Sequence, residues 1–430
     1  MIRLMKRKIL NNLILFMLIS STGGLLFVFN RNLSFLFFSL IIICSFFLLS
    51  KRIKSKNFYS SLLAFCTVTA LLIINFFVAE VQPQSVTKYS FFVVVFFVST
   101  LSLFYFHNQE NKNALLDSLY FILKIILFHS LISFLLYPFI EGNLETIKAY
   151  MSNGQEKHTA KTFKYLFYYI DIIEKPEAQV SLFGINLVRN SSIFWEPGIL
   201  QFYLNILFFL EISFYGRRNF MLFLISLAIL STYSTTGLLL LFLQIIYFLN
   251  KKFQKKYSTF IVFIIAIPIY IVLSSNINAK VYGEGESSFQ KRLLDFTQPL
   301  FIAIEHPING VGVDLDKFSD FRSKFYPNSK MLQTFYKSIS ISQYNQTTNK
   351  GSTNSFTYLL AGFGFPLMLL FIYAFLKQQI IRHNKMIFII LIFVSAMSEP
   401  LLHKPFFFMF IISGFINFYD KVIQNKSSLL

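Results

Sequence analysis

The chain has 430 residues, of which 55% are hydrophobic, 19% aromatic and only 14% charged. A soluble domain of this length has too little interior to bury so much apolar surface, so the composition excludes a soluble protein and indicates a polytopic membrane protein. The net charge of +19 resembles that of a nucleic-acid-binding protein. The basic residues, however, cluster beside the hydrophobic runs, which is typical of membrane topology and excludes a nucleic-acid partner. Cys44 and Cys66 both lie in apolar runs, so they indicate neither a disulfide framework nor a zinc site.

Runs of about 20 mostly apolar residues predict membrane-spanning helices. The segment of residues 1–8 is basic and precedes the first apolar run, and no clear small-residue cleavage site follows that run. We therefore expect an uncleaved first helix. Polar residues 231–237 interrupt one run and predict a tight hairpin of two short helices, whose break must be satisfied by protein or water. The predicted helices cover residues 9–29, 33–50, 58–79, 90–106, 114–140, 197–215, 220–249 (the hairpin), 258–276, 355–376, 386–398 and 406–419. The fold class is therefore all-α, a single polytopic domain over residues 1–430 with about 12 transmembrane helices.

Two long polar segments, residues 141–196 and 277–353, separate these helices. If both termini are cytoplasmic, nearly all the excess lysine and arginine falls on the cytoplasmic side, which is the positive-inside pattern. The two polar segments then form two external loops with nearly balanced charge. A site built from both loops would lie at the outer membrane–water boundary, where a lipid headgroup is presented.

The end of the first external loop places an arginine and a glutamate close to the start of a helix. Pro197 suits the first turn of a helix, where its missing N–H costs nothing, so Glu196 takes the N-cap position. Trp195, the only tryptophan, is typical of the membrane–water boundary. Arg189 precedes them. Two interpretations stay open: an aromatic anchor with a helix cap, or the edge of an active site.

The second external loop contains a short basic stretch, a helix and a glycine-containing turn. Lys291 and Arg292 precede an apolar helical pattern at residues 293–304, which Pro307 ends after His306. The glycines at 310 and 312 allow the backbone to approach another segment closely. His306 suits a helix C-terminal cap, and Asp314 with Asp316 resembles a metal pair only superficially.

Two further features suggest contacts with substrate or membrane. Residues 159–173 are rich in aromatic side chains and lysine, which predicts an interfacial helix on the outer leaflet or a platform for a saccharide. Lys124 and His129 lie inside an apolar run, where ionisable residues are functional candidates by default. They would line a groove for a lipid phosphate, or else pair with a neighbouring helix.

Together these motifs resemble the O-antigen polymerase and O-antigen ligase superfamily between about residues 189 and 375. The resemblance rests on an arginine before an aromatic-Glu-Pro-Gly helix start, a Ser/Thr-rich break between two short helices, Arg292 before a helix and its glycine turn, and a polar entry to a glycine-rich span. It implies a glycosyltransferase of the GT-C-like type in the bacterial cytoplasmic (inner) membrane, with no metal and no cofactor. Its substrate would be an oligosaccharide on undecaprenyl pyrophosphate, and its partners would include membrane lipids, a chain-length regulator and a flippase.

The resemblance also assigns roles to residues. Guanidinium groups bind pyrophosphate oxygens bidentately and stay charged, so Arg189 and Arg292 are the first candidates for the carrier, with Arg322, Lys291, Asn354 and His306 as further substrate-binding candidates. Glu196 is the candidate that orients or deprotonates the acceptor hydroxyl. For each arginine the competing interpretation is contact with a lipid headgroup or bracing of a loop.

The polymerase and ligase readings differ at one position. Ligases of this superfamily carry a histidine at the polar entry to the glycine-rich helix, whereas this chain has Ser352-Thr353-Asn354-Ser355 there. We therefore expect a polymerase of O-antigen or capsule-type repeat units, with a ligase as the alternative. A flippase or transporter is a third alternative, but the chain shows neither an internal repeat nor charges deep in many helices.

Overall fold

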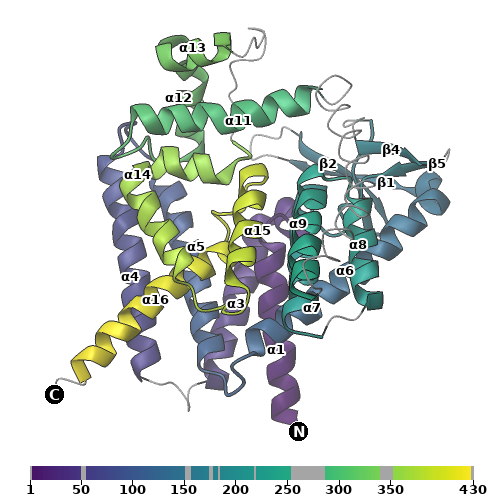
Figure 1. Ribbon diagram of the computed structural model, residues 1–430, viewed down its shortest axis with the longest axis horizontal. Coiled ribbons are helices and arrows are strands. Elements are labelled where there is room, and N and C mark those ends of the chain that lie inside the picture. The colour runs from purple at the N-terminus through teal and green to yellow at the C-terminus, as the bar shows by residue number, and fades with distance from the viewer. Residues whose placement is uncertain are drawn as a thin grey trace. The chain divides into compact units, whose positions relative to one another are not determined.

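The computed structural model describes residues 2–49, 55–150, 156–173, 178–182, 185–216, 219–252, 286–338 and 352–427 (Figure 1). The helix predicted at residues 258–276 lies outside these ranges. The chain divides into two compact units, each described by itself. The first comprises Met1–Ile41, Asn113–Glu286 and His383–Ser395, and the second comprises Ile42–Lys112, Ser287–Arg382 and Ala396–Leu430.

The first unit is built around α7 (Pro197–Ser213), whose side chains are buried from Pro197 to Ile212. An apolar helix can be buried on every face only where other helices surround it, and α6, α8 and α9 pack against it. The remaining described helices of this unit are α1 (Ile2–Ser20), α2 (Leu25–Phe29), α6 (Ala114–Ile140), α8 (Asn219–Ser231), α9 (Thr235–Lys252) and most of α15 (Lys385–Ser398). Helix α3 (Arg31–Leu49) runs across the division between the units.

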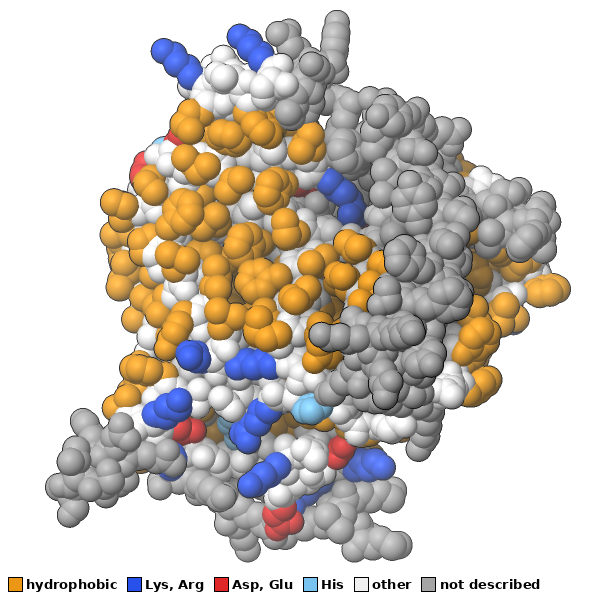
Figure 2. Space-filling model, viewed as in Figure 1, with side chains coloured by type: hydrophobic (Ala, Val, Ile, Leu, Met, Phe, Trp, Pro, Cys, Tyr) orange, Lys and Arg blue, Asp and Glu red, His pale blue; other side chains and the backbone are white. Residues whose placement is uncertain are grey.

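The second unit packs α16 (Pro405–Ser427) against α4 (Ser55–Val78), α5 (Val86–His107) and α14 (Ser355–Leu376). Its polar helices are α11 (Glu286–Glu305), α12 (Leu315–Asn328) and α13 (Lys330–Ser338). Figure 2 shows hydrophobic side chains covering the visible surface over α4 and α14. Such a surface suits lipid contact. On these two helices, Phe77, Leu369 and Tyr373 are all more than half exposed.

Five described helices are long and apolar enough to cross a membrane, namely Lys56–Val78, Val86–His107, Ala114–Asn143, Ser355–Leu376 and Pro405–Ile423. Shorter apolar helices include both arms of the hairpin, α8 and α9, so the prediction of two short helices around a polar break is confirmed. The bounds predicted for α6 and α14 are also confirmed. The protein is a mostly helical, multi-pass membrane protein, while the total of about 12 spans and the orientation of the termini stay predictions.

The prediction of one helix over residues 9–29 is wrong. Helix α1 ends at Ser20 and α2 begins at Leu25, because Gly23 has a φ of +119°, outside the range of a helix. The freed backbone groups pair with the stretch before α7: Leu25 N–H donates to the Ile193 carbonyl at 2.9 Å, and Trp195 N–H donates to the Gly23 carbonyl at 2.9 Å. The break therefore holds the residues that precede Glu196.

The all-α prediction also fails in the first polar segment, which forms two small antiparallel sheets. One contains β1 (Glu145–Tyr150), β2 (Glu156–Phe163) and β3 (Phe167–Tyr169), and the other contains β4 (Gln179–Leu182) and β5 (Ile185–Val188). The interfacial helix predicted at residues 159–173 is therefore wrong. Lys164 and Tyr165 have φ values of 48° and 56°, so two left-handed residues reverse the chain between β2 and β3.

Packing explains why this segment is a sheet. Tyr169 and Val188 are buried against Tyr137 and Ile140 at the end of α6, with Phe163 and Phe167 packed beside them. Thr162 stabilises the turn, since its hydroxyl donates to the Phe167 carbonyl and accepts from the Tyr165 N–H, each at 3.1 Å. The aromatic side chains thus cover α6 through strand alternation, a two-residue period that helical spacing does not reproduce.

Candidate active site

The turn that contains Gly310 and Gly312, called the glycine turn, packs closely against the glycine-rich helix α14 of the same unit. Val311 N–H donates to the Ala361 carbonyl at 2.9 Å, and Gly312 N–H donates to the Gly362 carbonyl at 3.0 Å. Gly364, with a φ of +74°, kinks α14 so that Phe365 N–H reaches the Pro307 carbonyl at 2.8 Å. A Cβ on Gly310 would lie 2.5 Å from the Ala361 oxygen. The predicted close backbone approach is therefore confirmed, and its target is α14.

Buried polar side chains of α4 and α5 fasten this turn. Asn75 donates from Nδ2 to the Asn309 carbonyl at 3.1 Å and to the Gly362 carbonyl at 3.0 Å. Its Oδ1 accepts from the Tyr89 hydroxyl at 2.7 Å, which itself accepts from the Val313 N–H at 3.1 Å. These bonds satisfy polar groups that would otherwise be buried alone, so the turn leads into α12 in one fixed conformation.

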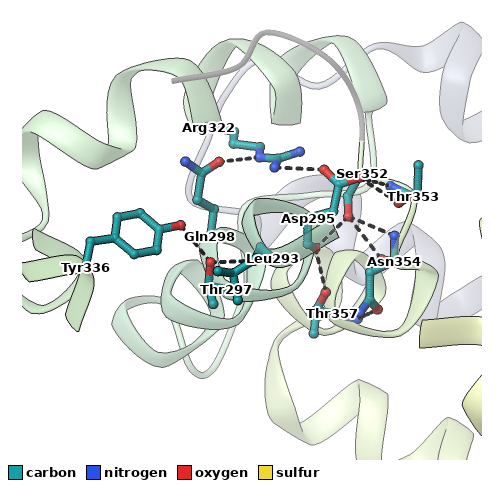
Figure 3. A network of polar contacts seen from close by, with 10 residues as sticks. All are labelled: Leu293, Asp295, Thr297, Gln298, Arg322, Tyr336, Ser352, Thr353, Asn354 and Thr357. Carbon is teal, nitrogen blue, oxygen red and sulfur yellow. Dashed lines mark hydrogen bonds and ion pairs between the residues drawn. The ribbon is translucent and has the colours of Figure 1, made fainter. Parts of the chain in front are cut away.

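A buried ion pair joins α11 to α12 and to the entry of α14 (Figure 3). Arg322 is fully buried, with Nη2 2.9 Å from Asp295 Oδ1 and Nε donating to Gln298 Oε1 at 2.6 Å. Burial lowers the pKa of the Arg322 guanidinium, while the Asp295 carboxylate raises it, and arginine keeps its charge beside such a partner. Asp295 also accepts from Thr353 N at 3.0 Å and Thr353 Oγ1 at 2.6 Å. Arg322 therefore has an internal partner for its charge.

The polar entry to α14 is held by structural hydrogen bonds. Asn354 is the N-cap of α14 and accepts from the Thr357 N–H at 3.0 Å, while Ser352 Oγ donates to the Asp295 carbonyl at 2.8 Å. Ser355 Oγ donates to the Glu399 carbonyl at 2.9 Å. Every residue of the stretch Ser352-Thr353-Asn354-Ser355 thus fixes the helix start, and Asn354 has a structural partner.

Arg292 lies one turn before Asp295 on α11 and is the more accessible guanidinium. Its side chain is 41% exposed, and Nη2 lies 3.8 Å from Oε1 of Glu399, a carboxylate that is only 3% exposed. A half-exposed guanidinium with five donors retains capacity for a further anion beside such a contact. The other two polar candidates are peripheral: Lys291 is exposed, and His306 contacts Glu80 through Nδ1 at the end of α11.

Arg189 and Glu196 belong to the first unit. Arg189 donates from Nε to the Thr232 carbonyl at 3.1 Å, and Asn190 N–H donates to the Ser231 carbonyl at 3.0 Å. These two residues satisfy the polar break of the hairpin, which confirms that protein groups fill it. Glu196 takes the predicted N-cap position of α7, but its carboxylate makes no capping hydrogen bond.

His129 connects α6 to the same stretch. Its Nδ1 lies 2.8 Å from Ser192 Oγ and its Nε2 lies 2.9 Å from the Leu166 carbonyl, with Phe167 stacked on the ring at 5.3 Å. This geometry favours the interpretation of His129 as a residue paired within the protein. Lys124 extends over the ring of Tyr120, 5.3 Å from its centroid.

Two carboxylates, those of Asp295 and Glu399, were not predicted as site residues from the sequence. Asp295 follows Arg292 by three residues, which places both on one face of α11. Glu399 lies between two strongly apolar helices, and an acid in that position is a functional candidate by default. Among the described residues no three His, Cys, Asp or Glu side chains lie together as metal ligands would.

These observations define a multi-pass helical membrane protein with an arginine-bearing polar region on helices outside its candidate spans. Residues 220–372 match a family model described as O-antigen ligase, so the chain carries a domain of this family, which O-antigen ligases and polymerases share. Members of the family are membrane enzymes of the glycosyltransferase type that act on lipid-linked glycans. No curated protein and no solved structure matches the chain significantly. The matched region contains Arg292, Asp295, Arg322 and Asn354, whereas Arg189, Glu196 and Glu399 lie outside it.

Proposed function

We propose that this protein polymerises undecaprenyl-pyrophosphate-linked oligosaccharide repeat units on the outer face of the bacterial cytoplasmic membrane. The observation that carries the proposal is the half-exposed Arg292 beside the buried Glu399. A pyrophosphate leaving group gains negative charge as the glycosidic bond breaks, and a positioned guanidinium stabilises that charge. The Glu399 carboxylate, 3.8 Å from Nη2, attracts the guanidinium, and its exposed donors would meet the carrier.

The first unit supplies two further residues. Arg189 is the second candidate cation for the carrier, and Glu196, at the start of α7, is the group that orients or deprotonates the acceptor hydroxyl.

The entry to α14 favours a polymerase over a ligase. The ligases that this chain resembles carry a histidine there, and here the corresponding residues form the cap and braces of α14. Asn354 has no group that could accept a proton in place of an imidazole. Transfer to another lipid-linked glycan therefore fits better than transfer to lipid A-core.

Complementation of a deletion strain tests the proposal. Arg292→Ala should lower long-chain glycan about 100-fold or more, the usual effect of removing one charge-stabilising donor. Arg292→Lys should restore only part of the activity, because an ammonium lacks the bidentate fork. Lys324→Ala, on exposed α12 surface, is the matched control. A normal chain-length ladder in Arg292→Ala at wild-type protein levels would contradict the proposed role.

The deletion strain itself separates the two reactions. Lipid A capped with a single repeat indicates a lost polymerase, as we expect. Bare core together with accumulated long polymer indicates a lost ligase and would overturn the polymerase assignment while leaving the role of Arg292 intact.

A further inference from the structure

A cavity of about 340 Å³ lies between α4, α14 and α16 of the second unit, away from the polar network described above. This volume is in the range of about 300–1,000 Å³ that is common for small-molecule sites. All three helices are candidate membrane spans. The lining residues are Thr67, Leu370, Tyr373, Ala374, Lys377, Gly414, Phe415, Asn417, Phe418, Tyr419 and Lys421.

The helices form this cavity through specific contacts. Gly414 packs against the backbone of Ala374 with no room for a Cβ. Asn417 Nδ2 donates to the Lys377 carbonyl at 3.1 Å, and the hydroxyls of Thr67 and Tyr419 are 2.5 Å apart. The polar groups at this level are thus paired between helices, and the cavity is part of the packed fold.

The chemistry of the lining is divided along the helices. Lys377 directly follows the last residue of α14, and Lys421 lies two residues before the end of the span Pro405–Ile423. Both lysines are exposed, and Lys377 Nζ lies 5.5 Å from the centre of the Tyr373 ring. Figure 2 shows Lys and Arg side chains gathered below the hydrophobic surface over these helices.

We infer that this cavity binds an anionic phospholipid, with the phosphodiester at Lys377 and Lys421 and an acyl chain along the apolar wall. No acidic residue is among the described residues that line it. Two cations beside apolar walls complement a lipid with a charged head and a hydrocarbon tail, as basic pockets between transmembrane helices do. The positive-inside pattern predicts the cytoplasmic leaflet for this end, opposite to the proposed active site.

Native mass spectrometry of the purified full-length protein tests this inference. The probes are phosphatidylglycerol and phosphatidylcholine with identical acyl chains. We expect the wild type to retain phosphatidylglycerol preferentially. A lysine near an anionic lipid surface contributes about fivefold in affinity, so Lys377→Ala with Lys421→Ala should weaken phosphatidylglycerol binding about 30-fold. Phosphatidylcholine binding should be unchanged. Lys112→Ala, an exposed lysine outside the cavity, is the matched control.

A second variant tests the apolar half independently of the lysines. Leu370→Trp should fill the cavity and reduce phosphatidylglycerol retention while both lysines remain, with circular dichroism confirming that either variant is folded. Equal retention of the two lipids by the wild type, or unchanged binding in both variants, would overturn the inference. Competition by inorganic phosphate as strong as that by the lipid would also overturn it, since the cavity would then hold a free anion. Displacement of phosphatidylglycerol by undecaprenyl phosphate at lower concentration would likewise overturn it, since the cavity would then hold the carrier.

Discussion

The buried pair of Arg322 and Asp295 gives the sharpest prediction about stability. Arg322→Met removes the cation and leaves the Asp295 carboxylate, whose side chain is 2% exposed, inside the protein. Breaking a buried ion pair in this way costs about 3–5 kcal/mol. Thr353 still donates two hydrogen bonds to Asp295 Oδ2, so we expect a loss of about 3 kcal/mol in the free energy of unfolding, the lower end of that range.

The same helix supplies the control. Lys324 pairs with Asp320 at 3.1 Å, and both side chains are more than 60% exposed. Lys324→Met should therefore cost less than about 0.5 kcal/mol, the value for an exposed pair one helical turn apart. Unfolding by SDS titration of the purified protein, followed by far-UV circular dichroism, measures both losses.

A third variant separates lost charge balance from lost packing. Adding Asp295→Asn to Arg322→Met removes the bare carboxylate, so part of the stability should return even though a second residue has been changed. If Arg322→Met lost no more stability than Lys324→Met, the buried ion pair of Arg322 and Asp295 would not stabilise the protein as we expect.

Three further predictions follow from the glycine contact, the helix cap and the topology. Gly364→Ala should destabilise the protein by at least about 1–2 kcal/mol, because the φ of +74° disfavours a side chain and the Ile308 carbonyl occupies the space that a Cβ would need. Gly142 has open space around it, so Gly142→Ala should be neutral in the same unfolding assay. Asn354→Ala should cost about 1 kcal/mol of stability through the lost cap of α14, whereas Asn354→Ser should retain most of the capping stability. The glycan yield should follow protein stability in both variants. A loss of glycan at full stability would instead show a direct role of Asn354 in the reaction. A tag inserted after Gly285 should react with an impermeant label in intact spheroplasts, and protection of that tag would contradict the predicted topology.

Local sequence determined the helical membrane framework. Helix α14 begins at Ser355, directly after its cap Asn354, and α7 begins at Pro197, because capping and proline geometry depend only on neighbouring residues. Hydropathy likewise placed α6 and the two arms of the hairpin, since lipid requires each span to be apolar along its own length. Arg189 and Arg292 were recognisable as candidates because they lie in motifs that resemble a superfamily with a pyrophosphate-linked substrate, which guanidinium groups bind well.

Tertiary structure decided which distant residues meet. Residues 159–163 and 167–169 are in strands because β2 pairs with β1 and β3 and because nearby aromatic side chains cover the end of α6, a packing partner that a local pattern does not reveal. Arg322 is buried next to Asp295, which lies on another helix, and Arg292 lies 3.8 Å from Glu399, which follows α15. Burial and pairing of charge depend on contacts between segments far apart in the chain, so only the folded arrangement distinguishes a bracing arginine from one that is open to substrate.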